Sequence, residues 1–269
     1  MKVSLDTEEN NSQSVELLKP PFIIGLSITG LSHNKIGLPC QDACKYEMIN
    51  PNFSVIALSD GLGSAKHSEL GSKIAVDSII YFCKNLNETI LMDLDCLHAE
   101  LKNSVEYARN EIEKFAEENK IEIHELACTL IIILVLERKA IVAQIGDGAV
   151  VGKTPNGFEL LSFPEDQEYV NEVVPITCHS WETSLKISTL FLDVEYIIAF
   201  TDGCQRAILT KKEGVWSPNS EFLDAFFSYL FKLKIKSDGE EFLKEIIESK
   251  KFSEISDDDK TLIVGNFEG

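Results

Sequence analysis

Aspartate residues stand at the ends of several predicted strands, and their carboxylates are the side chains best suited to chemistry. They are Asp60 before Gly61, the single Asp147, Asp202 before Gly203, and the pair Asp258-Asp259. One Asp-Gly pair alone is typical of a simple turn. Several carboxylates brought to one sheet edge, in contrast, repel one another unless a cation lies between them. The repeated placement therefore predicts a site for a hard divalent cation such as Mg²⁺ or Mn²⁺, which prefers oxygen ligands.

Residue spacing argues against other metal and catalytic sites. The five histidines and seven cysteines are scattered and form no ligand-spaced pair, which disfavours zinc. The loops at Asp60 and Asp202 lack the alternating oxygen ligands and closing glutamate of a calcium-binding EF-hand. The sequence matches neither the G-x-x-x-x-G-K-S/T phosphate loop nor the G-x-S-x-G nucleophile elbow. We interpret Cys204 as a packed thiol rather than a nucleophile.

Composition narrows the class of protein further. The chain has 269 residues with 44 acidic and 25 basic side chains, a formal charge of −19, so no nucleic-acid partner is expected. No signal peptide is recognisable, and no apolar run approaches the ~20 residues that cross a bilayer, so no membrane association is expected. An odd number of cysteines without a CxxC pair favours free thiols in a reducing compartment. We therefore expect a cytoplasmic protein.

The elements that must position the aspartates are short apolar strands and a few longer helices. Strands are predicted over 22–28, 53–58, 129–136, 140–145, 195–200 and 261–264. Helices are predicted over 69–86, 97–118, 220–232 and 240–250, where apolar residues recur at helical spacing. Two consecutive helices and adjacent later strands do not fit the alternation of a doubly wound parallel sheet. The order therefore favours an α+β fold with layered antiparallel sheets.

A single folded domain is expected after a short tail. Residues 1–20 are mostly polar, and Pro20-Pro21 cannot continue a helix. No linker rich in glycine, proline or serine divides residues 21–269, and no internal repeat is visible. We therefore predict a polar N-terminal tail over 1–20 and one domain over 21–269.

The order of the motifs resembles the metal-dependent Ser/Thr protein phosphatases of the PP2C type, in a bacterial branch. The matching segments run in the family's order as Gln41-Asp42-Ala43, Ser59-Asp60-Gly61, Ala127-Cys128-Thr129, Gly146-Asp147-Gly148, Thr201-Asp202-Gly203 and Asp258-Asp259-Lys260-Thr261. The opening stretch 30–42 and the segment 168–172 also resemble that branch. Each motif is short, but six in the same order make a fairly specific pattern.

The resemblance implies a fold, a cofactor and a reaction. The fold is a four-layer sandwich in which two packed antiparallel sheets are flanked by helices. Two Mn²⁺ or Mg²⁺ ions would be held by Asp60, which bridges them, by the Gly61 carbonyl, and by Asp202 and Asp258. Asp42 is expected to orient the attacking water, so that Asp42, Asp60 and Asp202 form the catalytic set. The substrate would be phosphoserine or phosphothreonine on a protein, and the expected partners are a cognate Ser/Thr kinase or its targets.

The sequence also departs from the family's pattern. Relatives with a phosphate-binding arginine carry it five residues before the aspartate that matches Asp42, where this chain has Gly37; His33 and Lys35 are possible substitutes. Leu62 stands where some relatives have a histidine proton donor, a role left open to His67. No aspartate for a third ion is found near the segment 127–129, where only His124 and Glu125 are close in sequence.

These departures keep other interpretations open. The missing arginine motivates a pseudophosphatase, a binding module of the same fold with little turnover, and a third reading treats the Asp-Gly pairs only as turns. Asp259 is the less expected ligand of its pair, because the family's metal residue is the first of the two. We expect Asp147 to hold a hairpin turn near the centre and the segment 153–188 to form a mobile flap over it.

Overall fold

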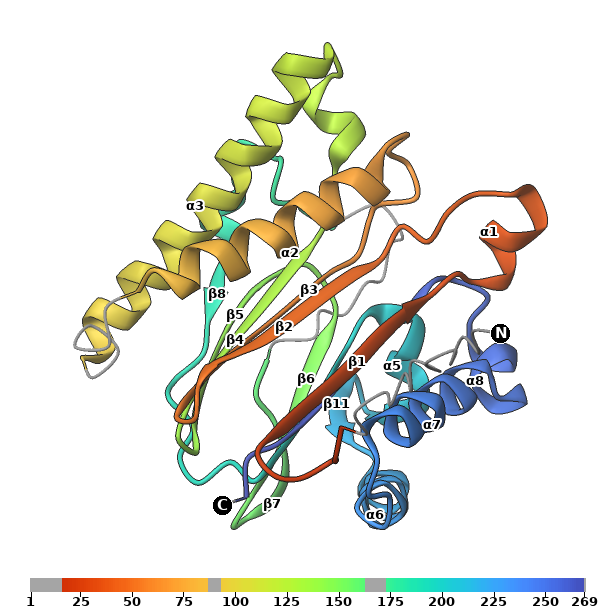
Figure 1. The fold of residues 1–269 in the computed structure, drawn as a ribbon. Helices are drawn as coiled ribbons and strands as arrows, with labels where there is room; N and C mark the ends of the chain where they lie inside the picture. The colour runs from red at the N-terminus through yellow and green to blue at the C-terminus, as the bar shows by residue number, and fades with distance from the viewer. Residues whose placement is uncertain (1–15, 87–92, 163–172, 269) are drawn as a thin grey trace, which may run out of the picture.

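The fold consists of two antiparallel sheets packed face to face, each covered on its outer side by helices (Figure 1). The computed structural model describes residues 16–86, 93–162 and 173–268. Sheet I has the strand order β2-β3-β4-β5-β8: β2 (Ala43–Asn50), β3 (Phe53–Ser59), β4 (Leu130–Leu136), β5 (Lys139–Ile145) and β8 (Lys186–Ile187). Sheet II has the order β1-β12-β9-β6-β7: β1 (Phe22–Ile28), β12 (Lys260–Asn266), β9 (Tyr196–Phe200), β6 (Ala149–Thr154) and β7 (Gly157–Leu160).

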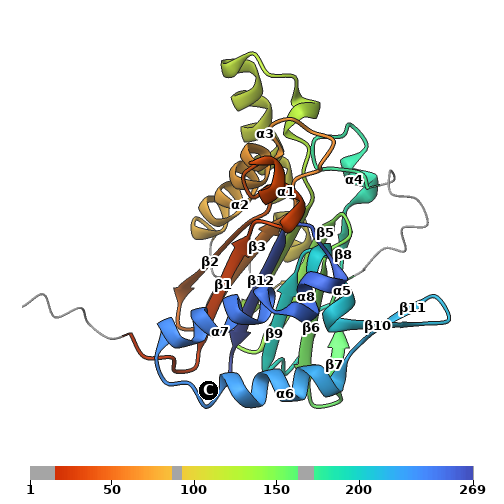
Figure 2. The ribbon, with the colours of Figure 1, turned by 90° about the vertical axis from the view of Figure 1, so that its right-hand side faces the viewer.

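The helices complete a four-layer arrangement. The long helices α2 (Ser68–Lys84) and α3 (Leu94–Asn119) lie over sheet I, and Figure 2 shows the C-terminal helices over sheet II. The C-terminal helices are α5 (Asp202–Ile208), α6 (Ser220–Leu230), α7 (Lys236–Glu248) and α8 (Lys250–Ile255). Smaller elements are α1 (Leu31–Ile36), α4 (Trp181–Ser184), the 3-10 helix Ile123–Leu126, and a hairpin of β10 (Leu209–Lys212) and β11 (Val215–Pro218). We call sheet I with α2 and α3 half I, and sheet II with α5–α8 half II.

Strand β4 shows why the layers form. All its residues are apolar, and side chains of a strand alternate between the two faces of its sheet. Leu130, Ile132 and Leu134 pack under α2 and α3, whereas Ile131 and Ile133 pack between the two sheets. A strand buried on both faces has no polar side, so its sequence is a continuous apolar run. Each sheet is thus sandwiched between its helices and the other sheet.

The predicted α+β architecture of two packed antiparallel sheets flanked by helices is confirmed. Each predicted strand and helix has a counterpart whose ends differ by a few residues. The sequence patterns missed β2, because this edge strand carries Lys45 and Glu47 among half-buried residues. They also missed the strands β6, β7, β8, β10 and β11 and the short helices α1, α4, α5 and α8, which have four to seven residues. Asp147 was expected in a hairpin, but its turn joins β5 of sheet I to β6 of sheet II and so links the two sheets.

Two further segments bear on the expected boundaries. Residues 1–15 lie outside the described part, while Leu18 is buried and donates its backbone N–H to the Lys234 carbonyl at 2.8 Å. Of the expected flap 153–188, residues 163–172 lie outside the described part, and this gap contains the whole segment 168–172. The remainder contains β7, α4 and β8. None of the helices described in the structure is long and apolar enough to span a membrane.

Candidate metal centre

The site lies where the two sheets bring strand ends together. Asp60 follows β3 of sheet I, and Asp202 follows β9 of sheet II. Asp258 and Asp259 precede β12, which pairs with β9 so that Leu262 lies opposite Phe200. Because β9 and β12 are antiparallel, the end of one lies beside the start of the other. Both halves therefore contribute carboxylates to the same edge of the molecule.

Asp60 is held in place by the backbone beyond the last paired residues of β3 and β4. Its N–H donates to Thr129 Oγ1 at 2.9 Å, and its carbonyl accepts the Thr129 N–H at 2.8 Å. The next residues continue this pairing, because Gly61 forms an antiparallel β-bridge with Cys128 and the Leu62 N–H donates to the Ala127 carbonyl at 2.9 Å. Hydrogen bonds thus join the segments 59–62 and 127–129, and they fix the backbone that carries the Asp60 side chain.

Gly61 allows a close approach of three chain segments. A Cβ atom at this position would lie 2.7 Å from the Gln41 carbonyl oxygen and 2.8 Å from Ser68 Cβ. Atoms at that separation overlap, so any side chain would push apart the loop before Asp42 and the first turn of α2. Glycine is therefore required for the backbone to pass between these elements next to Asp60.

Asp60 and Asp202 come from different sheets, but their side chains lie beside each other. The two side chains are within hydrogen-bonding reach, and Asp202 also accepts the Gly203 N–H at the start of α5. Removal from solvent, followed by repulsion from Asp42, Asp202, Asp147 and Asp258, raises the pKa of Asp60 well above its usual range. Burial and the charge of Asp258 likewise raise the pKa of Asp202. The cluster is therefore electrostatically strained and would gain from a positive charge.

Asp42 connects the two sheets. It lies just before β2 of sheet I, but its Oδ2 accepts hydrogen bonds from the hydroxyls of Thr201 and Thr261 in half II, each at 2.7 Å. Thr201 Oγ1 in turn accepts the Thr261 N–H at 3.0 Å. Burial raises the pKa of Asp42 to about 7, against the opposing effect of the two hydroxyls. Its Oδ1 is buried and has no hydrogen-bond partner in the described part of the chain.

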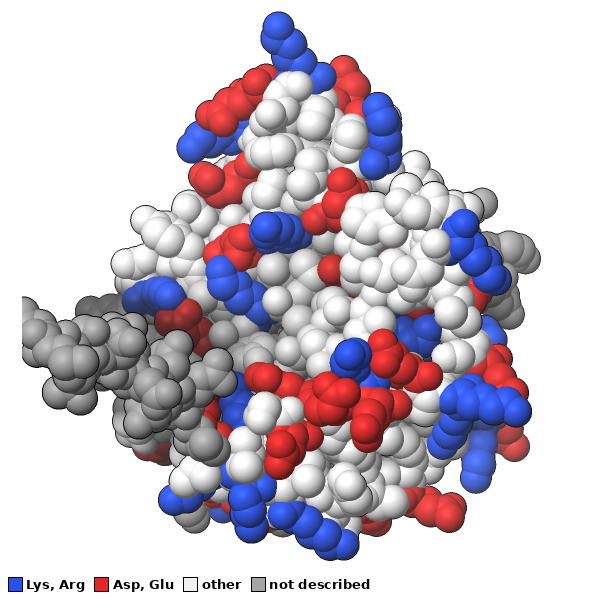
Figure 3. Space-filling view, turned by 45° about the vertical axis from the view of Figure 1, so that its right-hand side comes forward, with Lys and Arg blue, Asp and Glu red and all other residues white. Residues whose placement is uncertain are grey.

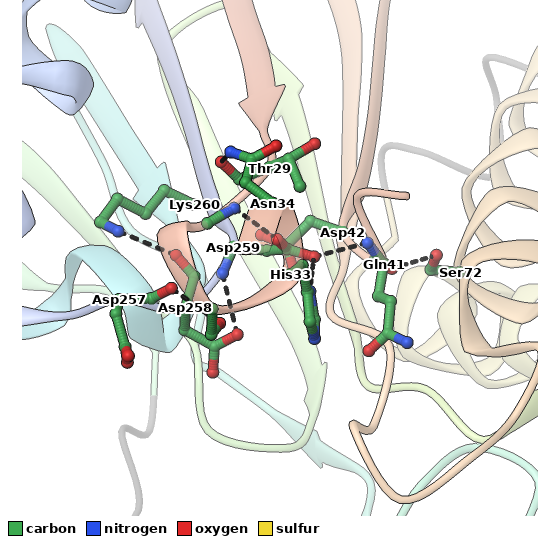
Figure 4. A network of polar contacts seen from close by, with 12 residues as sticks. Thr29, His33, Asn34, Gln41, Asp42, Ser72, Asp257, Asp258, Asp259 and Lys260 are labelled. Carbon is green, nitrogen blue, oxygen red and sulfur yellow. Dashed lines mark hydrogen bonds and ion pairs between the residues drawn. The ribbon is translucent and has the colours of Figure 1, made fainter. Parts of the chain in front are cut away.

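Asp258 and Asp259 are neighbours in sequence but have opposite environments (Figure 4). Asp258 is exposed, and its oxygen accepts the Asp259 N–H at 2.8 Å. Asp259 is buried, and its two oxygens accept the N–H groups of Gly30 at 2.6 Å and Gln41 at 2.5 Å. His33 Nδ1 lies 3.0 Å from Asp259 Oδ2. Asp259 therefore holds the segment around α1, while Asp258 is left facing solvent.

Lys260 supplies a fixed positive charge beside these carboxylates. The side chain is buried, and its Nζ donates to the carbonyl oxygens of Ser256 and Asp258, both at 2.8 Å. Its charge lowers the pKa of Asp202, opposing the stronger effects of burial and Asp258. The lysine therefore closes the loop that carries Asp258 and partly offsets the negative charge of the cluster.

The donor set fits a hard divalent cation. All the candidate ligands offer oxygen, and both Asp202 Oδ1 and Asp42 Oδ1 are buried acceptors without a partner among the described residues. Buried acceptors are rarely left unpaired without a functional reason. Asp258 also forms a group with His33 and Asp259 in which one ligand atom of each residue lies within 4.8 Å of the others. Asp258 is thus placed at the outer rim of the cluster, and Asp60 and Asp202 at its centre.

Several residues of this site had no role assigned from the sequence. Thr129, Thr201 and Thr261 position the aspartates, and Asp259 anchors the α1 segment. The only sequence signal is that the threonines adjoin aspartate motifs at strand ends. His33 lies at the rim beside Asp259, and Lys35 is exposed on α1. His67 precedes α2, where its N–H donates to the Glu125 carbonyl at 2.8 Å.

Comparisons with known proteins identify the family of the chain. The family model described as Protein phosphatase 2C matches residues 29–248. Serine/threonine-protein phosphatase 3 of Escherichia coli (strain K12) is 30% identical over 247 residues, covering 89% of this chain and 96% of that protein.

Solved structures show the same fold at low identity. The serine/threonine phosphatase Stp1 from Staphylococcus aureus has a TM-score of 0.63 at 17% identity, covering 94% of this chain and 98% of that one. The catalytic domain of the serine/threonine protein phosphatase PstP, solved with two manganese ions, has a TM-score of 0.61 at 14% identity, covering 91% and 97%. At such identities the likeness establishes the fold alone.

Proposed function

Because the chain belongs to the protein phosphatase 2C family, we propose that it hydrolyses phosphoserine and phosphothreonine on proteins with two divalent cations, Mn²⁺ or Mg²⁺. The observation that carries the proposal is that Asp60 from sheet I lies beside Asp202 from sheet II. Next to them are buried carboxylate oxygens that have no hydrogen-bond partner among the residues that the structure describes. Two turns without a function would have no reason to bring repelling charges together.

Each ligand is assigned by its place in the cluster. Asp60, at the centre, would bridge the two ions, and the Gly61 carbonyl would contribute to one of them. Asp202 and Asp258 would hold the other, with Asp258 reaching it from the rim. Bound there, the ions would activate a water molecule and neutralise charge on the phosphoryl oxygens.

The remaining residues orient the reactants. Two threonine hydroxyls hold Asp42 Oδ2, so Asp42 Oδ1 is left to accept a hydrogen bond from the attacking water and to direct it. Lys260 keeps the loop of Asp258 closed through two carbonyl contacts. Ser59 donates its hydroxyl to the Thr129 carbonyl at 2.5 Å and so braces the strand ends behind Asp60. The chain thus acts mainly by positioning.

The relatives support the substrate class. The Escherichia coli relative is named a serine/threonine-protein phosphatase, and the PstP domain holds two manganese ions. By this likeness the substrates of the present chain are phosphorylated proteins, and its partners are a cognate Ser/Thr kinase or the targets of that kinase. All seven cysteines are free thiols, which supports a cytoplasmic location.

The test is phosphate release by the purified protein. We expect release from a phosphoserine peptide and from p-nitrophenyl phosphate with Mn²⁺ or Mg²⁺, and none with a chelator. A phosphotyrosine peptide should react more slowly. Calorimetric titration with Mn²⁺ should show binding without substrate. Tight Mn²⁺ binding with no release would instead identify a binding module, and absence of Mn²⁺ binding would exclude the metal centre.

A further inference from the structure

The short helix α1 exposes apolar side chains that do not contribute to the core. None of its six residues is buried. Leu31 is 47% exposed, Ile36 is 70% exposed, and Leu38, just after the helix, is 42% exposed. Burial of such side chains is the main reason for a protein to carry them in a folded segment. None of the described residues of the chain buries these side chains.

This segment is nevertheless firmly attached next to the metal centre (Figure 4). Ser32 donates both its N–H and its hydroxyl to the Asp257 carbonyl, at 2.9 and 2.8 Å. Gly30 packs so closely on the same loop that a Cβ atom would lie 2.2 Å from the Asp258 carbonyl carbon. With the Asp259 contacts to Gly30, His33 and Gln41, both ends of the segment 30–41 are pinned. The exposed apolar side chains therefore sit on a rigid platform adjoining Asp258.

The charge around this platform is uneven. The segment 30–41 contains no acidic residue and carries Lys35 and His33. Across the same face, Figure 3 shows acidic side chains concentrated over α7, which carries Glu240, Glu241, Glu245 and Glu248. Asp257 and Asp258 are exposed and adjoin the segment 30–41 through Ser32 and Gly30. An acidic peptide would be repelled by the carboxylates of α7. An apolar peptide could pack against the exposed apolar side chains of the segment 30–41.

We propose that the α1 segment, residues 30–38, is the docking surface for the residues next to the phosphorylated side chain of a protein substrate, and that it selects apolar residues there. The inference rests on the proposed function, because only a phosphoryl group bound at the carboxylate cluster would bring its flanking residues onto α1. Continuity with that cluster, through Gly30 and Ser32, identifies the occupant.

The test compares one exposed residue on α1 with a matched residue elsewhere. Ile36 is 70% exposed and Val215, on the β10–β11 hairpin, is 69% exposed. Figure 2 shows the hairpin well separated from α1. Each is replaced by serine, which removes apolar area without adding charge. The substrates are p-nitrophenyl phosphate and two phosphoserine peptides that are identical except for leucine or glutamate at the flanking positions.

The expected result is a selective loss. Ile36→Ser should raise KM for the leucine peptide by about fivefold, the effect of losing part of one buried side chain. Its kcat/KM for p-nitrophenyl phosphate, which has no flanking residues, should stay within about twofold, and Val215→Ser should match the unmodified protein on every substrate. The unmodified protein should prefer the leucine peptide, and Leu38→Ser should reduce this preference like Ile36→Ser.

Other outcomes overturn the proposal. An equal loss on all three substrates would place Ile36 in the chemistry or in folding, and no change on any substrate would leave α1 without a docking role. If light scattering shows a dimer that Ile36→Ser dissociates while the leucine-peptide KM is unchanged, α1 is a contact between two copies. Failure of the proposed function is distinguishable, because the unmodified protein would then release no phosphate even from p-nitrophenyl phosphate.

Discussion

The two halves of the molecule hold their site residues by different means. In half I, Thr129 holds the backbone of Asp60 just beyond the last paired residues of β3 and β4: its N–H donates to the Asp60 carbonyl, and its hydroxyl accepts the Asp60 N–H. In half II, the hydroxyls of Thr201 and Thr261 donate to the carboxylate of Asp42, and Lys260 donates to the Asp258 carbonyl. Half I therefore fixes the backbone that carries Asp60, whereas half II supplies hydroxyls that hold a carboxylate oxygen directly.

The difference matters because the two halves meet at the site. Asp42 precedes a strand of sheet I, yet the hydroxyls that hold it belong to half II. The carboxylates of the two halves repel one another in the absence of a cation. Packing of the two halves therefore offsets the repulsion between the carboxylates of the site. Substitutions can separate this stabilising packing from the destabilising repulsion.

The largest effect is expected from Asp60→Asn, at the point where the halves meet. Loss of the central carboxylate should reduce kcat/KM for p-nitrophenyl phosphate by at least about 10³-fold, since several kcal/mol of metal-assisted stabilisation is removed. The rise in Tm that Mn²⁺ causes in the unmodified protein should disappear. In chelator, the variant should be no less stable than the unmodified protein, because repulsion and burial penalise the charge of Asp60.

Asp224→Asn, an exposed substitution on α6, is the control for removing one negative charge. If it lowers activity as much as Asp60→Asn does, net charge and not the centre is responsible. A marked loss of stability of Asp60→Asn in chelator would show that the carboxylate is structural.

Asp42→Asn tests the residue that spans the halves. The amide cannot accept from both threonine hydroxyls and orient water equally well, so kcat should fall by about 10- to 100-fold. The affinity for Mn²⁺, measured by calorimetry, should change little. A parallel loss of Mn²⁺ affinity would instead make Asp42 a direct ligand.

Thr129→Val and Thr201→Val compare the support of the Asp60 backbone in half I with the support of the Asp42 carboxylate by half II. Thr129→Val leaves the Asp60 N–H without its acceptor, and Thr201→Val takes a donor from Asp42 and an acceptor from the Thr261 N–H. Each should lower the free energy of unfolding by about 1–3 kcal/mol in urea titrations with chelator present. Thr201→Val should also lower kcat, because Asp42 loses its orientation. Equal kcat values for the two variants would contradict the distinction between the halves.

The smallest effect is expected at the surface of half II. Lys236 Nζ lies 3.0 Å from Glu16 Oε1, and the glutamate side chain is 71% exposed. Lys236→Ala should cost roughly 0.2–1 kcal/mol of unfolding free energy, decreasing with added salt, and should leave kcat unchanged. A change in kcat would connect the N-terminal segment to the site, which none of the contacts described above does.

Much of the fold was predictable because burial leaves a pattern in sequence. The run in β4 is apolar throughout since both faces of its sheet are covered, and α2 and α3 carry apolar residues at helical spacing. Strand β2 and helix α1 left no such pattern, the first being a half-buried edge and the second having no buried residue. Strand β2 is defined by its pairing with the adjacent strand β3. Helix α1 depends on contacts with Asp257 and Asp259, which are distant in the chain.

The chain alone determined which carboxylates are available and in what order they follow the strands, because residue types and strand periodicity are local properties. Only the tertiary structure decided what each carboxylate does, since its partners lie far away: Asp42 bonds to hydroxyls 159 and 219 residues later. Asp258 and Asp259 are identical in type and adjacent, yet one faces solvent and the other is buried against Gly30 and Gln41. The side chains of successive residues at the start of a strand point in opposite directions. Packing around them therefore leaves Asp258 at the rim of the carboxylate cluster and makes Asp259 the residue that anchors the α1 segment.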